Sequence, residues 1–279
     1  MGREQATRII EILEKAGFPA YFVGGCVRDT LLGREPEDWD IASAARPEQV
    51  MALFGADALP TGCKHGTVTV KCGGEAFEVT TFRTDGRYSD GRHPDQVTFA
   101  GSIREDLARR DFTINAMAMD LSGSITDLFG GREDLRRGLL RHVDDRSFPE
   151  DPLRVLRGAQ FAARFGFTVA EETVALCRTM DLSALSRERV EGELQKALLQ
   201  APRPSIFFRT LDTMHQLRPW FTEVQRLQGV PQPPRYHGEG DVWEHTMAVL
   251  DTAAELRPQA AQPMALMLAA LAHDFGKAV

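Results

Sequence analysis

The sequence predicts an α+β fold, in which a mixed sheet with helices is followed by all-α domains. Two observations predict it. Residues 67–72 and 75–82 read TVTVKC and EAFEVTTF, two strand-like runs separated by Gly73-Gly74, and this pattern is typical of a hairpin. From Glu150 onward, one helical pattern follows another. The chain is therefore expected to change from mixed to helical structure near residues 140 to 150.

The mixed part begins with a helix. Residues 4–16 carry apolar side chains at helical spacing, and Gly17 is placed to end the helix. The elements expected next are a buried strand at 21–24, a short helix at 27–33 that follows the Gly24-Gly25 turn, a strand at 38–42 and a helix at 47–54. Residues 83–97 are rich in glycine, aspartate and arginine and predict a long mobile loop, a kind of segment that is usually functional or disordered.

The helical part contains a break. Its first helices are expected at 150–167, 171–180, 186–199 and 205–215. The prolines and glycines of residues 229–241 forbid regular structure, and two more helical stretches follow them. We therefore expect three domains, namely the mixed sheet at 1–142, a helical domain at 143–228 and a helical tail at 229–279.

Composition and charge narrow the class of protein. A chain of 279 residues that is 43% hydrophobic can bury more than one core. Its net charge of -7 argues against non-specific coating of nucleic acid, so any such contact is expected on one face. No run approaches the roughly 20 apolar residues of a membrane span and no signal-peptide core is present, which predicts a cytoplasmic protein without membrane contact. The four cysteines lack C-x-x-C spacing and are expected to be reduced thiols.

Asp38 and Asp40 give the first chemical signal. On a strand their side chains project from the same side, with Cα atoms roughly 6 to 7 Å apart. Two carboxylates there repel each other unless a cation lies between them, and oxygen ligands suit Mg²⁺, which takes one or two protein carboxylates together with substrate phosphates. The alternative is a surface hairpin with two solvated aspartates.

The residues before this pair favour the metal. Gly24-Gly25 allows backbone N–H groups to approach an anion at the start of a helix, and Arg28, one turn later, can donate to a phosphate. The glycines and Arg28 are therefore expected to bind a triphosphate while Asp38 and Asp40 bind its metal. With twelve residues between Gly25 and Asp38, the arrangement resembles the signature of the nucleotidyltransferase superfamily that includes DNA polymerase β.

Three stretches narrow the resemblance. GGCVRDTLLG at 24–33, RRDFTINAMAMD at 109–120 and LRHVDDRSFPEDPLRVLRGAQFAARFGF at 140–167 are together similar to bacterial class II tRNA nucleotidyltransferases, the CCA-adding enzymes, and to their relatives the bacterial poly(A) polymerases. The resemblance is strong over residues 18–170 and looser beyond. It implies a polymerase β-like N-terminal domain, Mg²⁺ as cofactor, CTP and ATP as substrates, and tRNA, through its 3′ end and acceptor region, as partner.

The stretch PEDPLRVLR contains a candidate template for the incoming base. Asp151 is expected to cap a helix that starts at Pro152, with Arg154 and Arg157 one turn apart on one face. Cytosine and adenine both present an amino donor beside a ring-nitrogen acceptor. An accepting carboxylate from Asp151 and a donating guanidinium from Arg154 therefore satisfy C and A but leave U and G unpaired. The resemblance implies the same role, with Arg157 adding a phosphate or base contact; a helix cap with solvated arginines is the alternative.

Further candidates come from the resemblance and from the predicted sheet. By similarity, Arg110 contacts the nucleotide and Asp111 fixes the sugar region or the arginine, whereas Arg109 is either a further contact or a surface charge. Glu78 lies on a predicted strand that could run beside the two aspartates. It is a candidate third carboxylate or general base, and a solvent-facing strand residue is the alternative.

The resemblance implies in-line attack of a tRNA 3′-hydroxyl on the α-phosphate of CTP or ATP, with release of pyrophosphate. The loop at 83–97 argues against a CC-adding enzyme, and the lead-in to Glu150 looks more like the CCA-adding than the poly(A)-adding enzymes. An A-adding enzyme or a poly(A) polymerase is the alternative within the family. An RNA-binding module on a decayed nucleotidyltransferase is the non-enzymatic alternative, and the paired aspartates argue against it.

The C-terminal stretch, from HGEGDVWEHT to LAHDFGK, resembles the start of an HD phosphohydrolase domain. His237, His245, His273 and Asp274 are its candidate ligands for a transition metal. An HD site normally requires a further aspartate, and the sequence has five residues after Asp274. A truncated domain, or a helical tail that contacts tRNA, is therefore favoured over a working phosphatase.

Overall fold

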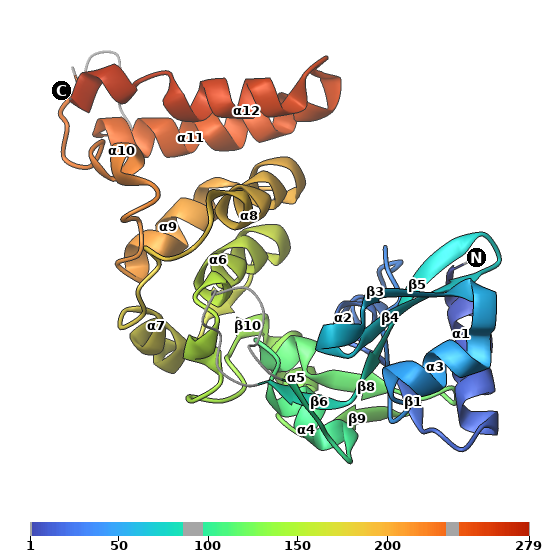
Figure 1. Cartoon of the computed structure of the whole chain (residues 1–279). Coiled ribbons are helices and arrows are strands. Elements are labelled where there is room, and N and C mark those ends of the chain that lie inside the picture. Colours follow the sequence, from blue (N-terminus) through green and yellow to red (C-terminus); the bar gives the residue numbers. More distant parts are fainter. Residues whose placement is uncertain (1, 86–96, 233–239, 279) are drawn as a thin grey trace. The chain divides into compact units, whose positions relative to one another are not determined.

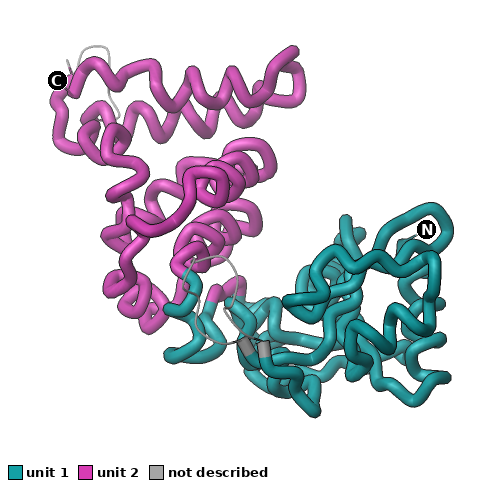
Figure 2. Tube along the Cα trace, viewed as in Figure 1, with its two compact units in different colours: residues 1–137, 141–151 teal, residues 138–140, 152–279 magenta. Residues whose placement is uncertain are grey.

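The computed structural model describes residues 2–85, 97–232 and 240–278. The chain divides into two compact units: unit 1 comprises residues 1–137 and 141–151, and unit 2 comprises residues 138–140 and 152–279 (Figure 2). The three-domain division expected from the sequence stays a prediction. In the part of the chain that the structure describes, no helix is both long enough and apolar enough to cross a membrane.

Unit 1 is built on a seven-stranded sheet with the strand order β3-β4-β5-β2-β1-β8-β9 (Figure 1). Its strands are β1 (Ala20–Val23), β2 (Ile41–Ser43), β3 (Ala58–Gly62), β4 (Thr67–Cys72), β5 (Glu75–Thr81), β8 (Met117–Met119) and β9 (Ile125–Asp127). β2 runs parallel to β5, and the other neighbouring strands are antiparallel. This mixed sheet confirms the predicted fold class, and the predicted hairpin joins β4 to β5 through Gly73 and Gly74, which both have positive φ.

The helices of unit 1 are α1 (Gly2–Lys15), α2 (Gly25–Leu31), α3 (Pro47–Phe54), α4 (Ile103–Ala108) and α5 (Gly131–Arg137), with a short 3-10 helix η3 (Thr113–Asn115) before β8. The apolar stripe predicted for the first helix is confirmed in part. Ile9, Ile10 and Leu13 are fully buried, and each such side chain contributes about 1.5–3 kcal/mol to stability. Ile12 instead remains 42% exposed.

Two sequence predictions are corrected in this unit. The strand expected at 38–42 begins only at Ile41: Phe22 of β1 pairs with Ile41, and beyond that pair a single bond remains, from the Val23 N–H to the Asp40 carbonyl at 3.1 Å. The loop expected over 83–97 is wrong at both ends, because β6 (Arg83–Asp85) pairs antiparallel with β7 (Val97–Phe99). Residues 86–96 of that loop lie outside the described residues.

Unit 2 is mainly helical. Its helices are α6 (Leu153–Phe165), α7 (Glu171–Cys177), α8 (Arg187–Gln200), α9 (Ser205–Thr213), α10 (Thr222–Gln225), α11 (Val242–Leu256) and α12 (Pro263–Ala272). α6 packs against α8 and α9, and α11 packs against α12 (Figure 1). A two-stranded parallel pair, β10 (Leu139–Leu140) with β11 (Thr168–Val169), adjoins α6. The helices expected from residue 150 onward are therefore confirmed.

Candidate active site

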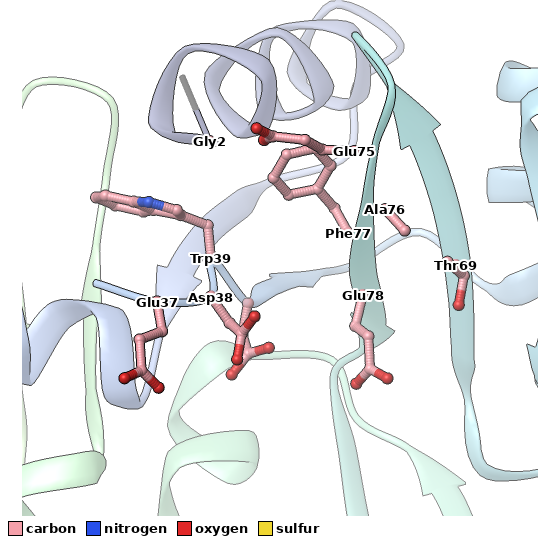
Figure 3. Close-up of a pocket in the computed structure, with 10 residues that line it drawn as sticks. Gly2, Glu37, Asp38, Trp39, Thr69, Glu75, Ala76, Phe77 and Glu78 are labelled. Atoms are coloured by element: carbon pink, nitrogen blue, oxygen red, sulfur yellow. The ribbon is translucent and has the colours of Figure 1, made fainter. Parts of the chain in front are cut away.

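Asp38 and Asp40 are placed by the residue between them. Trp39 is buried, and its ring packs edge-on against Phe22 of β1 with the ring centroids 5.0 Å apart. Figure 3 shows the Asp38 carboxylate directed away from the Trp39 ring. The buried tryptophan thus fixes the backbone so that its neighbours turn the other way. The alternation expected of a strand is kept here, although regular pairing starts only at residue 41.

Glu78 joins the two aspartates through the parallel pairing of β2 with β5. Ile41 pairs with Val79, which places Asp40 and Glu78 at the same level, one residue earlier on each strand. Asp38, Asp40 and Glu78 all line one cavity of about 620 Å³, and Figure 3 shows the carboxylates of Asp38 and Glu78 on the same side. The structure therefore brings the predicted third carboxylate to the predicted pair.

The electrostatics of Asp40 reflect this crowding. Burial raises the pKa of Asp40, Arg110 acts against this, and the charges of Glu78 and Asp38 raise the pKa further. A divalent cation would relieve the repulsion, and the donors are oxygens of the kind that Mg²⁺ prefers. Over residues 2–85, 97–232 and 240–278, however, the three carboxylates do not form a group whose ligand atoms all lie within 4.8 Å of one another. The fit to Mg²⁺ therefore rests on the oxygen chemistry of these donors, since Mg²⁺ takes one or two protein carboxylates together with phosphates and water.

The glycine turn lies beside this acidic cluster. Gly24 has a φ of 75°, which L side chains rarely adopt, and a Cβ atom there would lie 2.8 Å from Nη1 of Arg110. Its carbonyl accepts from the Arg28 N–H at 3.2 Å, closing the first turn of α2. The helix begins at Gly25, two residues earlier than predicted. The positive φ therefore favours glycine at position 24, and a side chain there would also displace the end of the Arg110 side chain.

Arg28 is held by protein groups rather than left open to solvent. Its Nε and Nη2 each donate to Asp29 at 2.9 Å, and its Nη1 donates to Asn115 at 2.7 Å. Asn115 in turn donates to Asp111 at 3.1 Å, and the same carboxylate oxygen accepts from the Phe112 N–H at 2.7 Å. This chain of bonds ties α2 to η3. A phosphate contact by Arg28 stays a prediction, and its hydrogen bonds to Asp29 and Asn115 favour a role in holding the turn.

Arg110 and Arg109 share one acidic partner that sequence reasoning missed. Asp106 accepts from both arginines, and its side chain has no exposed surface. Arg109 is therefore not a surface charge. Asn115 was missed in the same way, although both residues stand in or beside the RRDFTINA stretch. The roles of Asp106 and Asn115 arise from contacts between segments. The only sequence signal for these roles is the position of both residues in or next to the RRDFTINA stretch.

The candidate template residues fall on both sides of the division between the units. Asp151 is the last residue of unit 1, whereas Arg154 and Arg157 lie in α6 of unit 2. The helix starts at Leu153 with Pro152 as its cap residue, so the expected cap at Asp151 is one residue too early. Arg154 is buried, and the guanidinium of Arg157 lies 5.2 Å from the centre of the Phe161 ring. The face is therefore not made of solvated arginines.

The histidine cluster of the tail is assembled in unit 2. His245 of α11, His273 and Asp274 bring one ligand atom each within 4.8 Å of one another, and they form the one such group in the part of the chain that the structure describes. Asp274 also forms an ion pair with the Lys277 ammonium, with Nζ and Oδ2 2.8 Å apart, so a cation of the protein already balances this carboxylate. His237 lies outside the described residues. Metal binding by this cluster stays a prediction.

Proteins of known family that are similar to this chain include a poly A polymerase head domain family and CCA-adding enzymes. Residues 20–141 match the family of poly A polymerase head domains. A CCA-adding enzyme of Lactobacillus helveticus is 47% identical over 213 residues, which are 75% of this chain and 53% of that enzyme. One of Geobacillus stearothermophilus is 50% identical over 199 residues, 70% of this chain and 49% of that enzyme. The chain thus spans about half the length of these relatives.

A solved structure extends the match over nearly the whole chain. The crystal structure of the Bacillus stearothermophilus CCA-adding enzyme in complex with CTP has 33% sequence identity and a TM-score of 0.70, and the match covers 98% of this chain and 78% of that chain. The likeness therefore includes both the sheet unit and the helical unit.

Proposed function

This chain belongs to the CCA-adding enzyme family, and on that premise we propose that it adds C and A to the 3′ end of tRNA from CTP and ATP, with release of pyrophosphate. The observation that carries the proposal is the acidic cluster of Asp38, Asp40 and Glu78 on one side of the sheet, with Arg110 and the Gly24 turn beside it. Carboxylates for a metal next to cationic and backbone donors for phosphates are the parts that phosphoryl transfer requires.

Each part of the site has a proposed task. Asp38 and Asp40 would hold Mg²⁺, which supplies neutralisation of phosphate charge and a lower pKa for the attacking hydroxyl. Arg110 and the amides that follow Gly24 bind the triphosphate and orient the α-phosphate toward the tRNA 3′-hydroxyl. Glu78 is proposed as a further acceptor beside the pair.

Base selection is assigned to the other candidate residues. We infer that the Asp151 carboxylate accepts from the amino group that C and A share, and that the Arg154 guanidinium donates to their ring nitrogen. Arg157 adds a contact to phosphate or base, and Asp111 fixes the sugar region. Uracil and guanine would leave these groups unpaired, which discriminates by orders of magnitude when the groups are buried. We further propose a cytoplasmic location, because the four cysteines lack the spacing of a disulfide framework.

Nucleotide incorporation tests the proposal. The protein is incubated with Mg²⁺, labelled CTP or ATP, and a tRNA that lacks its 3′ end. Addition of two C and one A supports the CCA-adding function, addition of A only after CC supports the A-adding alternative, and a long A tail supports poly(A) polymerase. Absence of label from the RNA, with tRNA bound, favours the non-enzymatic binding module.

Asp38→Ala tests the metal-binding pair. We expect incorporation to fall by at least about a hundredfold, because a metal ligand is worth several kcal/mol of transition-state stabilisation. Binding of tRNA, measured by fluorescence anisotropy, should be nearly unchanged.

Glu75→Ala is the matched control for that variant. It removes a carboxylate from the same cavity, but Figure 3 shows Glu75 on the side of Trp39 rather than on that of Asp38. Its activity should stay within about twofold of wild type, as is usual for surface substitutions. Comparable turnover in Asp38→Ala would refute the assignment of the pair.

A further inference from the structure

Asp106 holds two neighbouring arginines with a single buried carboxylate. Its Oδ1 accepts from Nε and Nη2 of Arg109 at 3.0 and 2.8 Å, and its Oδ2 accepts from Nη2 of Arg110 at 3.0 Å. Burial alone would raise the pKa of Asp106, but the charges and hydrogen bonds of the two arginines outweigh burial and hold this pKa below its ordinary value. The carboxylate is therefore ionised at neutral pH, as a buried charge with two cationic partners should be.

The carboxylate occupies a fixed place relative to the sheet. Leu107, the next residue of α4, is fully buried in a cluster with Val23 of β1 and Ala42 of β2. The Arg110 N–H donates to the Leu107 carbonyl at 3.2 Å. β1 leads into the glycine turn, and Asp40 immediately precedes β2. The helix α4, which carries Asp106, is thus packed onto β1 and β2, the same two strands that position the candidate site.

The position of the Arg110 guanidinium depends on its hydrogen bond to Asp106. Its Nη1 lies 2.8 Å from the place that a Cβ of Gly24 would take, and its charge acts on Asp40. Within the described residues, the bond to Asp106 is the one side-chain hydrogen bond that Arg110 makes, and its Nε is buried without a partner. Removal of the Asp106 charge would therefore weaken the one side-chain hydrogen bond that holds this guanidinium among the described residues.

The geometry points to Asp106 as a positioning residue for the proposed reaction. It holds Arg110 between the glycine turn and Asp40, where the triphosphate of the incoming nucleotide would bind, and it does not touch the nucleotide itself. Splitting one carboxylate between two arginines leaves the outer N–H groups of Arg110 available to phosphate oxygens. This inference rests on the proposed function and extends it to a residue behind the site.

Asp106→Asn in the full chain keeps the shape of the side chain and removes its charge. We expect KM for CTP and for ATP to rise about tenfold, because a charge-assisted hydrogen bond that fixes a phosphate ligand is lost. KM for tRNA should stay within about twofold, because the inference assigns Arg110 to the triphosphate of the incoming nucleotide and not to tRNA. A nucleotide KM equal to that of wild type would overturn the inference.

Two comparisons separate positioning from a general loss of structure. Asp134→Asn is the matched control, because Asp134 is also buried and accepts from Thr113 Oγ1 at 2.7 Å and from Arg141 Nε at 3.2 Å. It should lower the melting temperature without a selective rise in nucleotide KM. In an Arg110→Ala background, Asp106→Asn should change nucleotide KM by less than about twofold, because residues that act through one another are not additive. A further tenfold rise there would show that Asp106 acts by another route.

A second variant and a wild-type measurement complete the test. If Asp106→Asn does not fold, Asp106→Glu is used instead, because it keeps the negative charge beside the two arginines but displaces Arg110. The KM for CTP and ATP should then rise. An unchanged nucleotide KM overturns the inference. A wild-type protein that neither incorporates nor binds ATP or CTP refutes the proposed function and the inference together. If the wild type is active and the Asp106 variants keep the wild-type KM for CTP and ATP, the inference is refuted and the proposed function is not.

Discussion

At the scale of the residue, the two aspartates of the candidate site are the same chemical group in different surroundings. Asp38 is exposed, whereas Asp40 is half-buried beside Glu78 and Arg110. Burial and like charge raise the pKa of Asp40, so its ionised form is destabilised in the folded protein until a cation arrives. The site is therefore arranged to bind a positive charge, and this can be measured without any turnover.

Asp40→Asn should raise the melting temperature at pH 7 in the absence of divalent ions, because it removes an ionised group that the fold disfavours. Added Mg²⁺ should stabilise the wild type, by about 2.7 kcal/mol at a hundred times its dissociation constant, and should stabilise the variant less. Asp38→Asn is the matched control for the effect without Mg²⁺, because it removes the same charge from an exposed position. Differential scanning fluorimetry with and without Mg²⁺ measures both effects.

The sign of the pH dependence follows from the same pKa. An aspartate ionises at about pH 3.9 in an unfolded chain, and Asp40 ionises at higher pH in the folded protein. Stability should therefore fall as pH rises from the unfolded to the folded pKa and should change no further above it. The Asn variant should lack this loss. An identical pH profile for the two proteins would contradict the environment described for Asp40.

At the scale of the element, the turn from β1 into α2 brings the backbone close to the acidic cluster. Gly24 has positive φ and Arg110 lies directly above it, whereas the nearest atom to a Cβ on Gly25 would be Arg28 Nη2 at 3.6 Å, an ordinary contact. The two adjacent glycines therefore differ in what they tolerate. Gly24 is required by its backbone conformation, and a side chain there would displace the Arg110 guanidinium; neither applies to Gly25.

Gly24→Ala should destabilise the protein by about 1–3 kcal/mol, the usual cost of a side chain in a sparsely populated backbone region. Gly25→Ala, in the same turn, should cost less, because its φ is not positive and the added methyl group has room. Urea unfolding of the two variants measures the difference. Equal free energies of unfolding would show that the turn relaxes freely and that Arg110 moves aside.

Elements defined by local signals were predictable from the sequence. The helix at 47–54 has the predicted bounds, since Pro47 fixes its first turn, and the hairpin follows from its two glycines. The structure of the segment around Asp38 could not be predicted in this way. The length of β2 depends on its pairing with β1 and with β5, and the local sequence pattern does not determine that pairing. The strands at 83–85 and 97–99 were missed for the same reason.

At the scale of the whole molecule, the proposed tasks are divided between compact units. The acids proposed to bind metal belong to unit 1, and the arginines proposed to select the base belong to α6 of unit 2. The motif residues themselves were recognisable from the sequence. Their supporting partners, Asp106 and Asn115, were not, because those roles come from hydrogen bonds that only the folded unit forms.

Arg154→Ala should therefore relax base choice without loss of the chemical step. Incorporation of UTP and GTP relative to CTP and ATP should rise by at least about tenfold, because the donor that leaves the wrong bases unpaired is gone. Arg164→Ala is the control, since it removes an arginine from the same helix, near the ring of Phe165. Unchanged rejection of UTP and GTP in the Arg154 variant would show that the template lies elsewhere.

The parallel pairing of β2 with β5 has a consequence for how the protein acquires its activity. Residues 41 and 79 can become neighbours only when the chain between them, which includes α3 and the β3–β4 connection, closes into a loop. Contacts between distant parts of the sequence carry a loop-closure cost and form slowly. A chain in which β2 and β5 have not yet paired therefore has the aspartates and Glu78 but not their arrangement, and catalytic competence should appear no earlier than this pairing.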